Sequence, residues 1–548
     1  MGKIIFLPVV AMLTALVGCG SSACPAGSVA VAGGCVLSGD GGIDAHLSGV
    51  DAAADAGVRA ADGGDSGTPP MDSCSPGAAD PITVADIDEN CDGVDGDAAN
   101  EVFVAPSGDD SNTGTRMSPF RTLGRAIERA AGRPILVAGD QLVADTGLGN
   151  AGATSPMPTE IHGGYDALSW RRASTRSQIG GTGSHAGLGT LLTLGADFSF
   201  DRFEFVGADA AGFGAAYAMR VEGGGHMLTL TDCVLRAGRG DRGADGVHPA
   251  LAMAGASGRT GEACVGIIQC TGPAPSTTFN SNGCTLDRAG TGGGSNMVGG
   301  NSLGGRAGGG TAFGADGLAG ESGSAGSAGS AGLAAATGTG SIDASWTFRA
   351  PQGGAGTRGA AGSSGGGGGG GYPQLIQACT GAATEITRTN AGPGAAGGSG
   401  GEGGCGGEGG GGGNAGFASI ALAARDAVLV LHDVTLSTTG GGAGGAGQPG
   451  SVGGAGGARG QGGPRVCNTG STPHYLAYAG GVGGGGGNGG DGGAGAGGPG
   501  GPSIGLVVLG STTVTTDGGT FTLGPGGLGG SSEVLRGADG MQIQQQSL

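Results

Sequence analysis

Short segments in which hydrophobic and polar residues alternate recur along the chain from residue 198 onward. Alternation with a period of two is typical of strands that bury one face. The apolar positions are Phe198, Phe200, Phe203 and Phe205 in the first segment, Leu228, Leu230 and Leu235 in the second, and Leu429, Leu431 and Leu436 in the third, with a looser fourth segment at 507–523. We expect these segments to be successive rungs of an all-β solenoid.

A second pattern, with glycine at every third position, fills the long stretches between these segments. It is unbroken in five runs, at residues 314–332, 353–371, 394–412, 441–456 and 480–501. Helices have a period of 3.6 and strands a period of two, whereas the polyproline II family has three residues per turn. The last run contains a single proline, Pro499, which disfavours a collagen-like trimer. The runs therefore predict rods folded back on one another as a polyglycine II bundle. The alternative is a flexible Gly/Ser-rich tract.

The two patterns divide most of the chain into parts. The expected parts are a first β portion at 102–238, a glycine-rich insertion at 239–416, a single rung at 417–437, a second insertion at 438–502, and C-terminal rungs with a tail at 503–548. Stacked repeats tolerate insertions at their turns because an insertion there need not disturb the stacked core. The predicted fold class is therefore all-β, a short solenoid with glycine-rich insertions.

The N-terminal residues have the pattern of a targeting segment, residues 1–18, rather than of folded structure. Lys3 precedes an apolar stretch at 4–17, and residues 16–19 read Leu-Val-Gly-Cys. This ending resembles the lipobox of bacterial lipoproteins, which implies cleavage before Cys19 and lipidation of its thiol. Because residue 20 is glycine and not aspartate, the resemblance also implies anchoring in the outer membrane, facing the periplasm or the cell exterior. The alternatives are a plain secretory signal and a short membrane helix.

Residues 19–73 would link the lipidated cysteine to the rest of the protein. Cys24 and Cys35 bracket a ten-residue loop and are expected to pair. From residue 38 to residue 70 the chain is mostly Asp, Ala and Gly, a composition that cannot bury a core and predicts a disordered acidic tether. The formal net charge of the whole chain is −19, which argues against a nucleic-acid partner.

Residues 74–101 carry oxygen-bearing side chains at closely spaced positions. The candidate metal ligands are Asp86, Asp88, Asn90, Asp92, Asp95 and Asp97. Such spacing around a glycine suits the flexible coordination of calcium. An EF-hand loop has glutamate at its twelfth position, but the twelfth residue counted from Asp88 is Ala99, so this is no EF-hand. The segment resembles the Cys/Asp-rich metal-binding motif of Gram-negative surface proteins, similar to thrombospondin type 3 repeats, which implies calcium as cofactor. Cys74 could pair with Cys91 and clamp the loop; the alternative is an acidic turn without an ion.

Residues 102–131 carry the clearest family resemblance. Residues 102–110 (VFVAPSGDD), 112–115 (NTGT) and 118–122 (SPFRT), together with 162–166 (HGGYD) and 170–172 (WRR), resemble the opening of right-handed parallel β-helices of the pectate-lyase-like group. The residues themselves predict a strand, a polar turn and a short helix at 123–131 that would cap the open end of the solenoid. The resemblance implies a right-handed parallel β-helix and no particular activity.

Candidate catalytic residues are sparse. The seven histidines fall in no zinc-binding motif. A lyase of the group that the chain resembles would need an acidic cluster and a basic residue on one solenoid face. Asp201, Asp232 and Asp433, with Arg202 or Arg236, are the candidates. Aspartates at turns more often cap backbone amides.

We therefore expect a lipid-anchored cell-surface protein with a structural or binding role and no catalytic activity. Its glycine-rich module would be displayed to a surface polysaccharide or to a protein partner. Two other functions stay open: a calcium-dependent polysaccharide lyase or hydrolase, and an ice- or surface-binding module.

Overall fold

The computed structural model describes residues 28–31, 34–37, 74–83, 87–139, 143–144, 157–180, 189–210, 212, 214–263, 290–293, 315–335, 340–371, 373–376, 394–468 and 474–548. The chain divides into two compact units, Met1–Pro70 and Met71–Leu548. The described residues of the first unit form an antiparallel hairpin of β1 (Ser28–Val31) and β2 (Gly34–Leu37). Cys35 lies in β2, whereas Cys19 and Cys24 fall outside the described residues, so their predicted roles stay predictions.

The second unit is built on three sheets in which neighbouring strands are parallel. A seven-stranded sheet contains β3 (Val102–Val104), β4 (Ile135–Ala138), β6 (Thr159–Tyr165), β9 (Phe198–Asp201), β12 (Met227–Thr231), β18 (Val428–His432) and β23 (Thr513–Asp517). A six-stranded sheet contains β5 (Val143–Ala144), β7 (Ser177–Gly180), β10 (Phe203–Val206), β13 (Val234–Ala237), β19 (Thr435–Thr438) and β24 (Thr520–Leu523). A five-stranded sheet contains β8 (Thr190–Thr193), β11 (Ala216–Glu222), β17 (Ser419–Arg425), β22 (Ser503–Leu509) and β25 (Gln542–Ser547). From β8 onward the chain visits the three sheets in rotation, so each pass adds one strand to every sheet.

The segments with alternating hydrophobicity stack in register, as the sequence predicts. Leu230 of β12 is paired with Phe200 on one side and with Leu431 on the other. These side chains are almost completely buried, and they belong to one hydrophobic cluster between the sheets. The predicted helix is confirmed as α1 (Leu123–Ala130), which contributes to the same cluster and contacts the first strand, β3.

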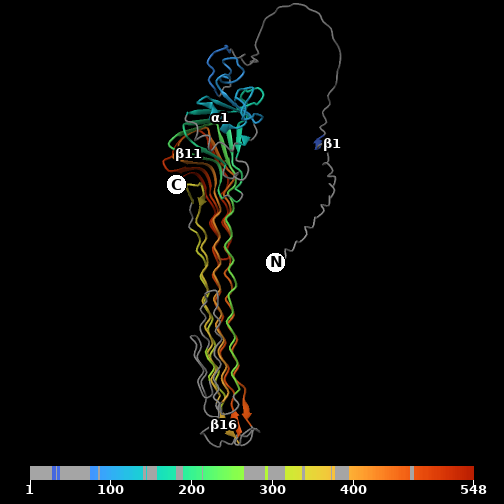
Figure 1. Ribbon diagram of the computed structural model, residues 1–548, viewed down its shortest axis with the longest axis vertical. Helices are drawn as coiled ribbons and strands as arrows, with labels where there is room; N and C mark the ends of the chain where they lie inside the picture. Colours follow the sequence, from blue (N-terminus) through green and yellow to red (C-terminus); the bar gives the residue numbers. More distant parts are fainter. Residues whose placement is uncertain are drawn as a thin grey trace, which may run out of the picture. The chain divides into compact units, whose positions relative to one another are not determined.

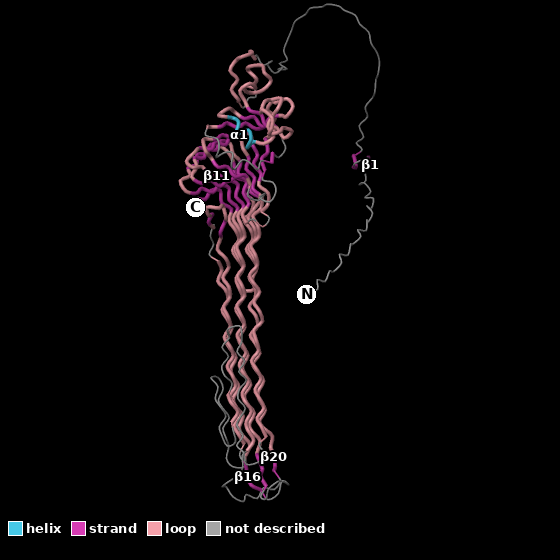
Figure 2. Tube along the Cα trace, in the orientation of Figure 1, coloured by secondary structure: helices cyan, strands magenta, loops and turns pink. Residues whose placement is uncertain are grey.

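The glycine-rich segments leave the sheets between β13 and β17 and between β19 and β22. Figure 1 shows them running side by side away from the sheets, and Figure 2 shows that they contain few strands. We call the hydrogen-bonded stretches rod 1 (240–262), rod 2 (317–333), rod 3 (353–371), rod 4 (395–416), rod 5 (440–463) and rod 6 (480–501). Residues 524–540, which the sequence analysis assigned to the tail, also join rods 5 and 6 through backbone hydrogen bonds.

Rod 4 shows how the rods are joined. Three consecutive amides of this rod donate to three different neighbouring segments, and the bonds to rod 6 recur every third residue from Gly398 to Gly416. The three consecutive bonds are Gly397 N to Gly293 O at 2.9 Å, Gly398 N to Gly481 O at 3.0 Å and Ser399 N to Arg259 O at 3.0 Å. A chain with three residues per turn points successive amides in three directions. Within the described residues, the glycine runs are therefore hydrogen-bonded rods and not a flexible tract.

Glycine occupies most of the positions at which a rod faces another backbone. A Cβ on Gly486 would lie 1.9 Å from Glu402 O, and one on Gly487 would lie 2.0 Å from Ser324 O. On Gly485, by contrast, the nearest atom would be 3.8 Å away. From residue 480 to residue 494, two of every three positions in rod 6 therefore face a neighbouring backbone and the third faces outward, whereas Gly497 and Gly500 in that third row face residues 530 and 527. Glycine at every third position alone accounts for only one such row in each rod.

The second unit also contains antiparallel strands that were not predicted from the sequence. The hairpin of β14 (Ser341–Ile342) and β15 (Phe348–Arg349) precedes rod 3. Its Trp346 and Phe348 pack with Tyr217 and Ile420 of the five-stranded sheet in a second hydrophobic cluster. The strands β16 (Pro373–Ile376), β20 (Val466–Asn468) and β21 (His474–Ala477) form a small sheet at the ends of the rods, where Figure 2 shows them.

Two neighbouring glycines of rod 6 give a matched test of this packing. Gly486→Ala should destabilise the protein by about 1–3 kcal/mol or more, because the new methyl group overlaps the carbonyl of residue 402. Gly485→Ala should leave stability unchanged or raise it by up to about 1 kcal/mol, because its methyl group enters open space and the unfolded chain loses entropy. Guanidinium unfolding of both full-length variants checks this, and equal effects would contradict rod packing.

Candidate functional site

The acidic segment forms a loop that is closed by a disulfide. Cys74 and Cys91 are bonded, which confirms the predicted pair. The two cysteines are 17 residues apart, and a cross-link of this span stabilises a fold by about 3 kcal/mol, chiefly by restricting the unfolded chain. The loop is therefore held closed whether or not an ion is bound.

Two predicted ligands also shape the loop through backbone hydrogen bonds. Asp88 accepts from the amides of Asp92 at 3.1 Å and Gly93 at 2.8 Å. Asp92 accepts from the amides of Val94 at 3.0 Å and Ala98 at 2.9 Å. The bond from Val94, two residues after Asp92, is an Asx turn, and the other three bonds join more distant parts of the loop. A carboxylate oxygen that accepts one amide can still coordinate a cation through a second lone pair.

The remaining predicted ligands are placed differently. Asn90 accepts from the Asp92 amide at 2.8 Å and donates to Gly96 O at 3.1 Å, which fixes the turn. Asp97 accepts from the Ala99 amide at 3.0 Å and lies outside the carboxylate groups described next. Asp86 falls outside the described residues.

Carboxylates gather in two groups that share Asp80. One group contains Asp80, Glu89 and Asp95, the other Asp80, Asp88 and Asp92, and within each group the ligand oxygens lie within 4.8 Å of one another. Both carboxylate oxygens of Asp80 and Oε2 of Glu89 are buried without a hydrogen-bond partner in the structure. Burial, and then Glu89, raises the pKa of Asp80 to about 6. Buried carboxylates this close together favour a shared proton or a cation.

Two members of the first group, Asp80 and Glu89, were missing from the predicted ligands. Glu89 lies between two predicted ligands, Asp88 and Asn90, so it was overlooked inside the motif. Asp80 precedes the motif by several residues, and the disulfide from Cys74 to Cys91 brings its segment against the loop. The cysteine spacing was the one available sign that residues near 80 belong to the site.

Side chains from outside the loop donate to its backbone carbonyls. The bonds run from Arg116 Nη1 to Asp92 O at 2.9 Å, from the Tyr165 hydroxyl to Asp95 O at 3.1 Å, and from Arg172 Nη1 to Thr83 O at 3.2 Å. Tyr165 belongs to β6, so these bonds fix the acidic loop to the seven-stranded sheet.

Beside this contact lies a buried ionic network that includes one candidate catalytic aspartate. Asp201 Oδ2 is 2.9 Å from His162 Nδ1, and the other oxygen of Asp201 pairs with Arg172. Glu160 lies 3.8 Å from the second ring nitrogen of His162. Burial alone lowers the pKa of His162, but the hydrogen bond to Asp201 and the nearby carboxylate of Glu160 outweigh it and the net pKa is raised.

The other candidate catalytic aspartates stand at the corner between the seven-stranded and six-stranded sheets. Asp232 and Asp433 both have a left-handed backbone, with φ of 50°, and Arg202 has a φ of 55°. The strands that precede them pair in register, so these residues occupy equivalent corners of successive passes. Asp232 pairs with Arg176 at 2.5 Å and with Arg202 at 3.7 Å.

The remaining basic candidate is engaged elsewhere. Arg236 pairs with Glu204 of the neighbouring strand at 2.9 Å. Asp201 comes one residue before the corner, in register with Thr231. The structure therefore places Asp232 and Asp433 in one column and Asp201 beside it.

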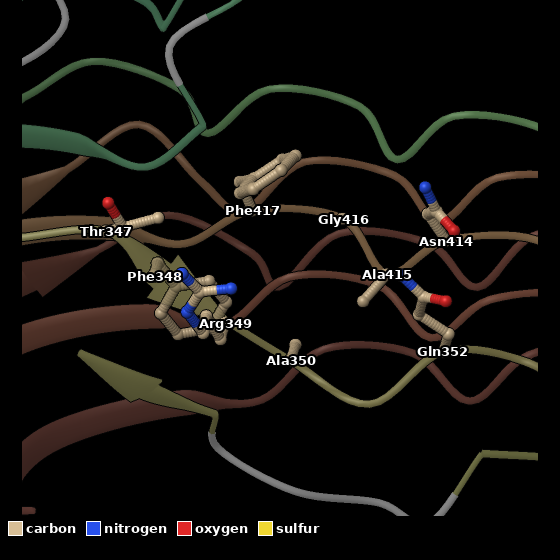
Figure 3. A pocket seen from close by; sticks show the side chains of 9 residues that line it. All are labelled: Thr347, Phe348, Arg349, Ala350, Gln352, Asn414, Ala415, Gly416 and Phe417. Carbon is tan, nitrogen blue, oxygen red and sulfur yellow. The ribbon is translucent and has the colours of Figure 1, made fainter. Parts of the chain in front are cut away.

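A separate cavity of about 440 Å³ opens where rods 3 and 4 approach the five-stranded sheet (Figure 3). It is lined by residues 347–350, 352 and 414–417. None of these residues was predicted from the sequence. They lie at the ends of two glycine runs that are far apart in the chain, and the bond from Gly353 N to Gly413 O brings the two runs together.

Comparison with known protein families, with curated proteins and with solved structures finds no match to this chain. Among the described residues, no helix is long and apolar enough to cross a membrane.

The raised pKa of His162 predicts a pH dependence of stability. A histidine whose pKa is higher in the folded than in the unfolded state stabilises the fold below its unfolded pKa, near 6.5, and this contribution is lost as the pH rises through the folded pKa. The stability advantage of the natural protein over His162→Gln should therefore be larger at pH 6 than at pH 9, as measured by guanidinium unfolding.

His226→Gln is the matched control, because that side chain is 41% exposed and lies 3.8 Å from Asp197. Its stability difference from the natural protein should be nearly the same at both pH values. A His162→Gln difference that is independent of pH would contradict the assigned network.

Proposed function

We propose that this chain is a lipid-anchored structural or binding protein of the bacterial cell surface. Its folded part is a short right-handed parallel β-helix that carries a bundle of polyglycine II rods. The observation that carries this proposal is rod 4, whose consecutive amides bond to three different neighbouring segments. Along its length rod 4 is also bonded to rods 3, 5 and 6. A segment joined to several neighbours in this way is stiff, as display away from a membrane requires.

Two observations support the β-helix. The chain passes through three sheets in rotation, and successive passes align like residues, such as Phe200, Leu230 and Leu431. Helix α1 packs against the first strand, β3, as a cap on a solenoid would. Such stacking explains how the long rod insertions are tolerated, because each begins and ends at a turn between adjacent strands.

Two observations support a structural role over catalysis. The candidate carboxylates Asp201 and Asp232 are engaged in ion pairs with neighbouring arginines, where they hold turns and strands together. Rod 2 presents exposed serine and alanine residues at regular intervals, for example Ser324, Ala325, Ser327 and Ala328. Small side chains of this kind suit contact with an extended surface or partner and supply no group for moving protons.

The anchor is tested at Cys19. In a Gram-negative host, Cys19→Ala should abolish the mass of the diacylglycerol group at the mature N-terminus and release the protein from the membrane fraction. A membrane-impermeant label applied to intact cells should mark the natural protein. Cys24→Ala is the control, which should keep both lipidation and membrane association. An unmodified natural protein, cleaved elsewhere, would refute the anchor.

We further propose that the acidic loop binds calcium through Asp80, Glu89 and Asp95. Their oxygens fit a hard cation with flexible coordination. Calorimetric titration of the full chain should show calcium binding, and Asp80→Asn should weaken it by about tenfold or more because Asp80 belongs to both groups.

Asp97→Asn is the matched control, since Asp97 lies outside both groups. It should bind calcium as the natural protein does. Absence of heat at millimolar calcium, or equal losses in the two variants, would reject the site.

A further inference from the structure

The cavity at the sheet end of the rods arises because rods 3 and 4 separate there. The ladder between them runs up to the bond from Gly353 N to Gly413 O at 2.9 Å. Beyond this bond, rod 3 leads back to the hairpin of β14 and β15, and rod 4 leads into β17. The space left between the diverging chains is the 440 Å³ cavity of Figure 3. Its volume is within the range of small-molecule sites, about 300–1,000 Å³.

The walls combine aromatic rings with side-chain amides. Phe348 is only 3% exposed and is fixed in the cluster over the five-stranded sheet, and Phe417 packs against the same cluster. Gln352 and Asn414 carry the amides, and Figure 3 shows both on the rod side of the cavity. Neither amide side chain forms a hydrogen bond within the described part of the protein. Each therefore has donors and an acceptor to offer a ligand.

The charge of the lining excludes ionic ligands. No carboxylate is among the lining residues, so nothing there attracts a cation. The one lining cation, Arg349, pairs with Asp343 at 3.2 Å, and this pair leaves little net attraction for an anion. A purely apolar ligand would bury the amides of Gln352 and Asn414 without partners, which costs free energy. The class of ligand that fits this lining is therefore neutral, with apolar faces and many hydroxyl groups.

We propose that this cavity binds a neutral saccharide. The apolar face of a pyranose ring packs on the walls formed by Phe348 and Phe417. Its hydroxyl groups pair with the amides of Gln352 and Asn414. This proposal deepens the proposed binding function, because it names the partner class and the site. It does not depend on the lipid anchor.

The test uses the purified full chain and saturation-transfer difference NMR. The probes are maltose, cellobiose and N,N′-diacetylchitobiose, with digalacturonate as an anionic probe. At least one neutral probe should receive saturation, and digalacturonate should not. The double variant Gln352→Ala/Asn414→Ala should weaken that binding by about tenfold or more, because two hydrogen-bonding groups are removed.

Gln461→Ala is the control. Its side chain is an exposed amide of rod 5 that does not line the cavity. It should bind as the natural protein does, and unfolding curves of all variants establish that they fold. If the double variant is unstable, the exposed single variant Gln352→Ala replaces it. The proposal is overturned if no neutral probe binds at millimolar concentration, if digalacturonate alone binds, or if Gln461→Ala weakens binding as much as the cavity variant does. Failure here leaves the anchor and rod proposals standing, because they are measured separately on cells and by unfolding.

Discussion

Close approach between backbones, which only glycine allows, is the constraint on which the rod bundle depends. A Cβ at most contact positions would lie about as near a neighbouring carbonyl as it does at Gly486, 1.9 Å. Glycine loses more conformational freedom on folding than any other residue, so the bundle must recover this cost through nearly complete hydrogen bonding and not through apolar burial. The backbone hydrogen bonds that join rod 4 to rods 1, 3, 5 and 6 contribute to that recovery.

The parallel sheets supply the apolar burial that the rod bundle lacks. Phe200, Leu230, Leu431 and their neighbours bury a conventional core between the sheets, and each of the two glycine-rich insertions begins and ends at strands of these sheets. Because both ends of each insertion are fixed in adjacent passes of the chain, the entropy cost of bringing the rods together is reduced. The core therefore supplies hydrophobic stability that the glycine segments lack, and the disulfide at Cys74 and Cys91 reinforces the acidic loop outside it.

Sequence periodicity was sufficient to locate the alternating strands and rods 2 to 6, because each period reports which face of the chain is covered. It could not reveal which rods are neighbours, since glycine runs are chemically alike, nor that rod 6 uses two contact rows, since Gly485 and Gly486 are the same residue in opposite environments. The hairpin that carries Trp346 has no periodic pattern and was missed. In the acidic loop, the motif located Asp88, Asp92 and Asp95, but Asp80 joins the site only through tertiary contacts.

Close contact between backbones also restricts where functional side chains can gather in this protein. Along the rods, most positions that face a neighbouring backbone are glycine, and the few side chains buried within rod 4, such as Ser399, Glu402 and Cys405, are separated by glycines. Several functional side chains can meet more readily where neighbouring backbones separate and leave space between them. This happens where rods 3 and 4 part beside Phe417 and where the acidic loop folds against β6 through Tyr165. Each of the two candidate binding sites thus lies where the close-packed or sheet-paired backbone gives way to irregular chain.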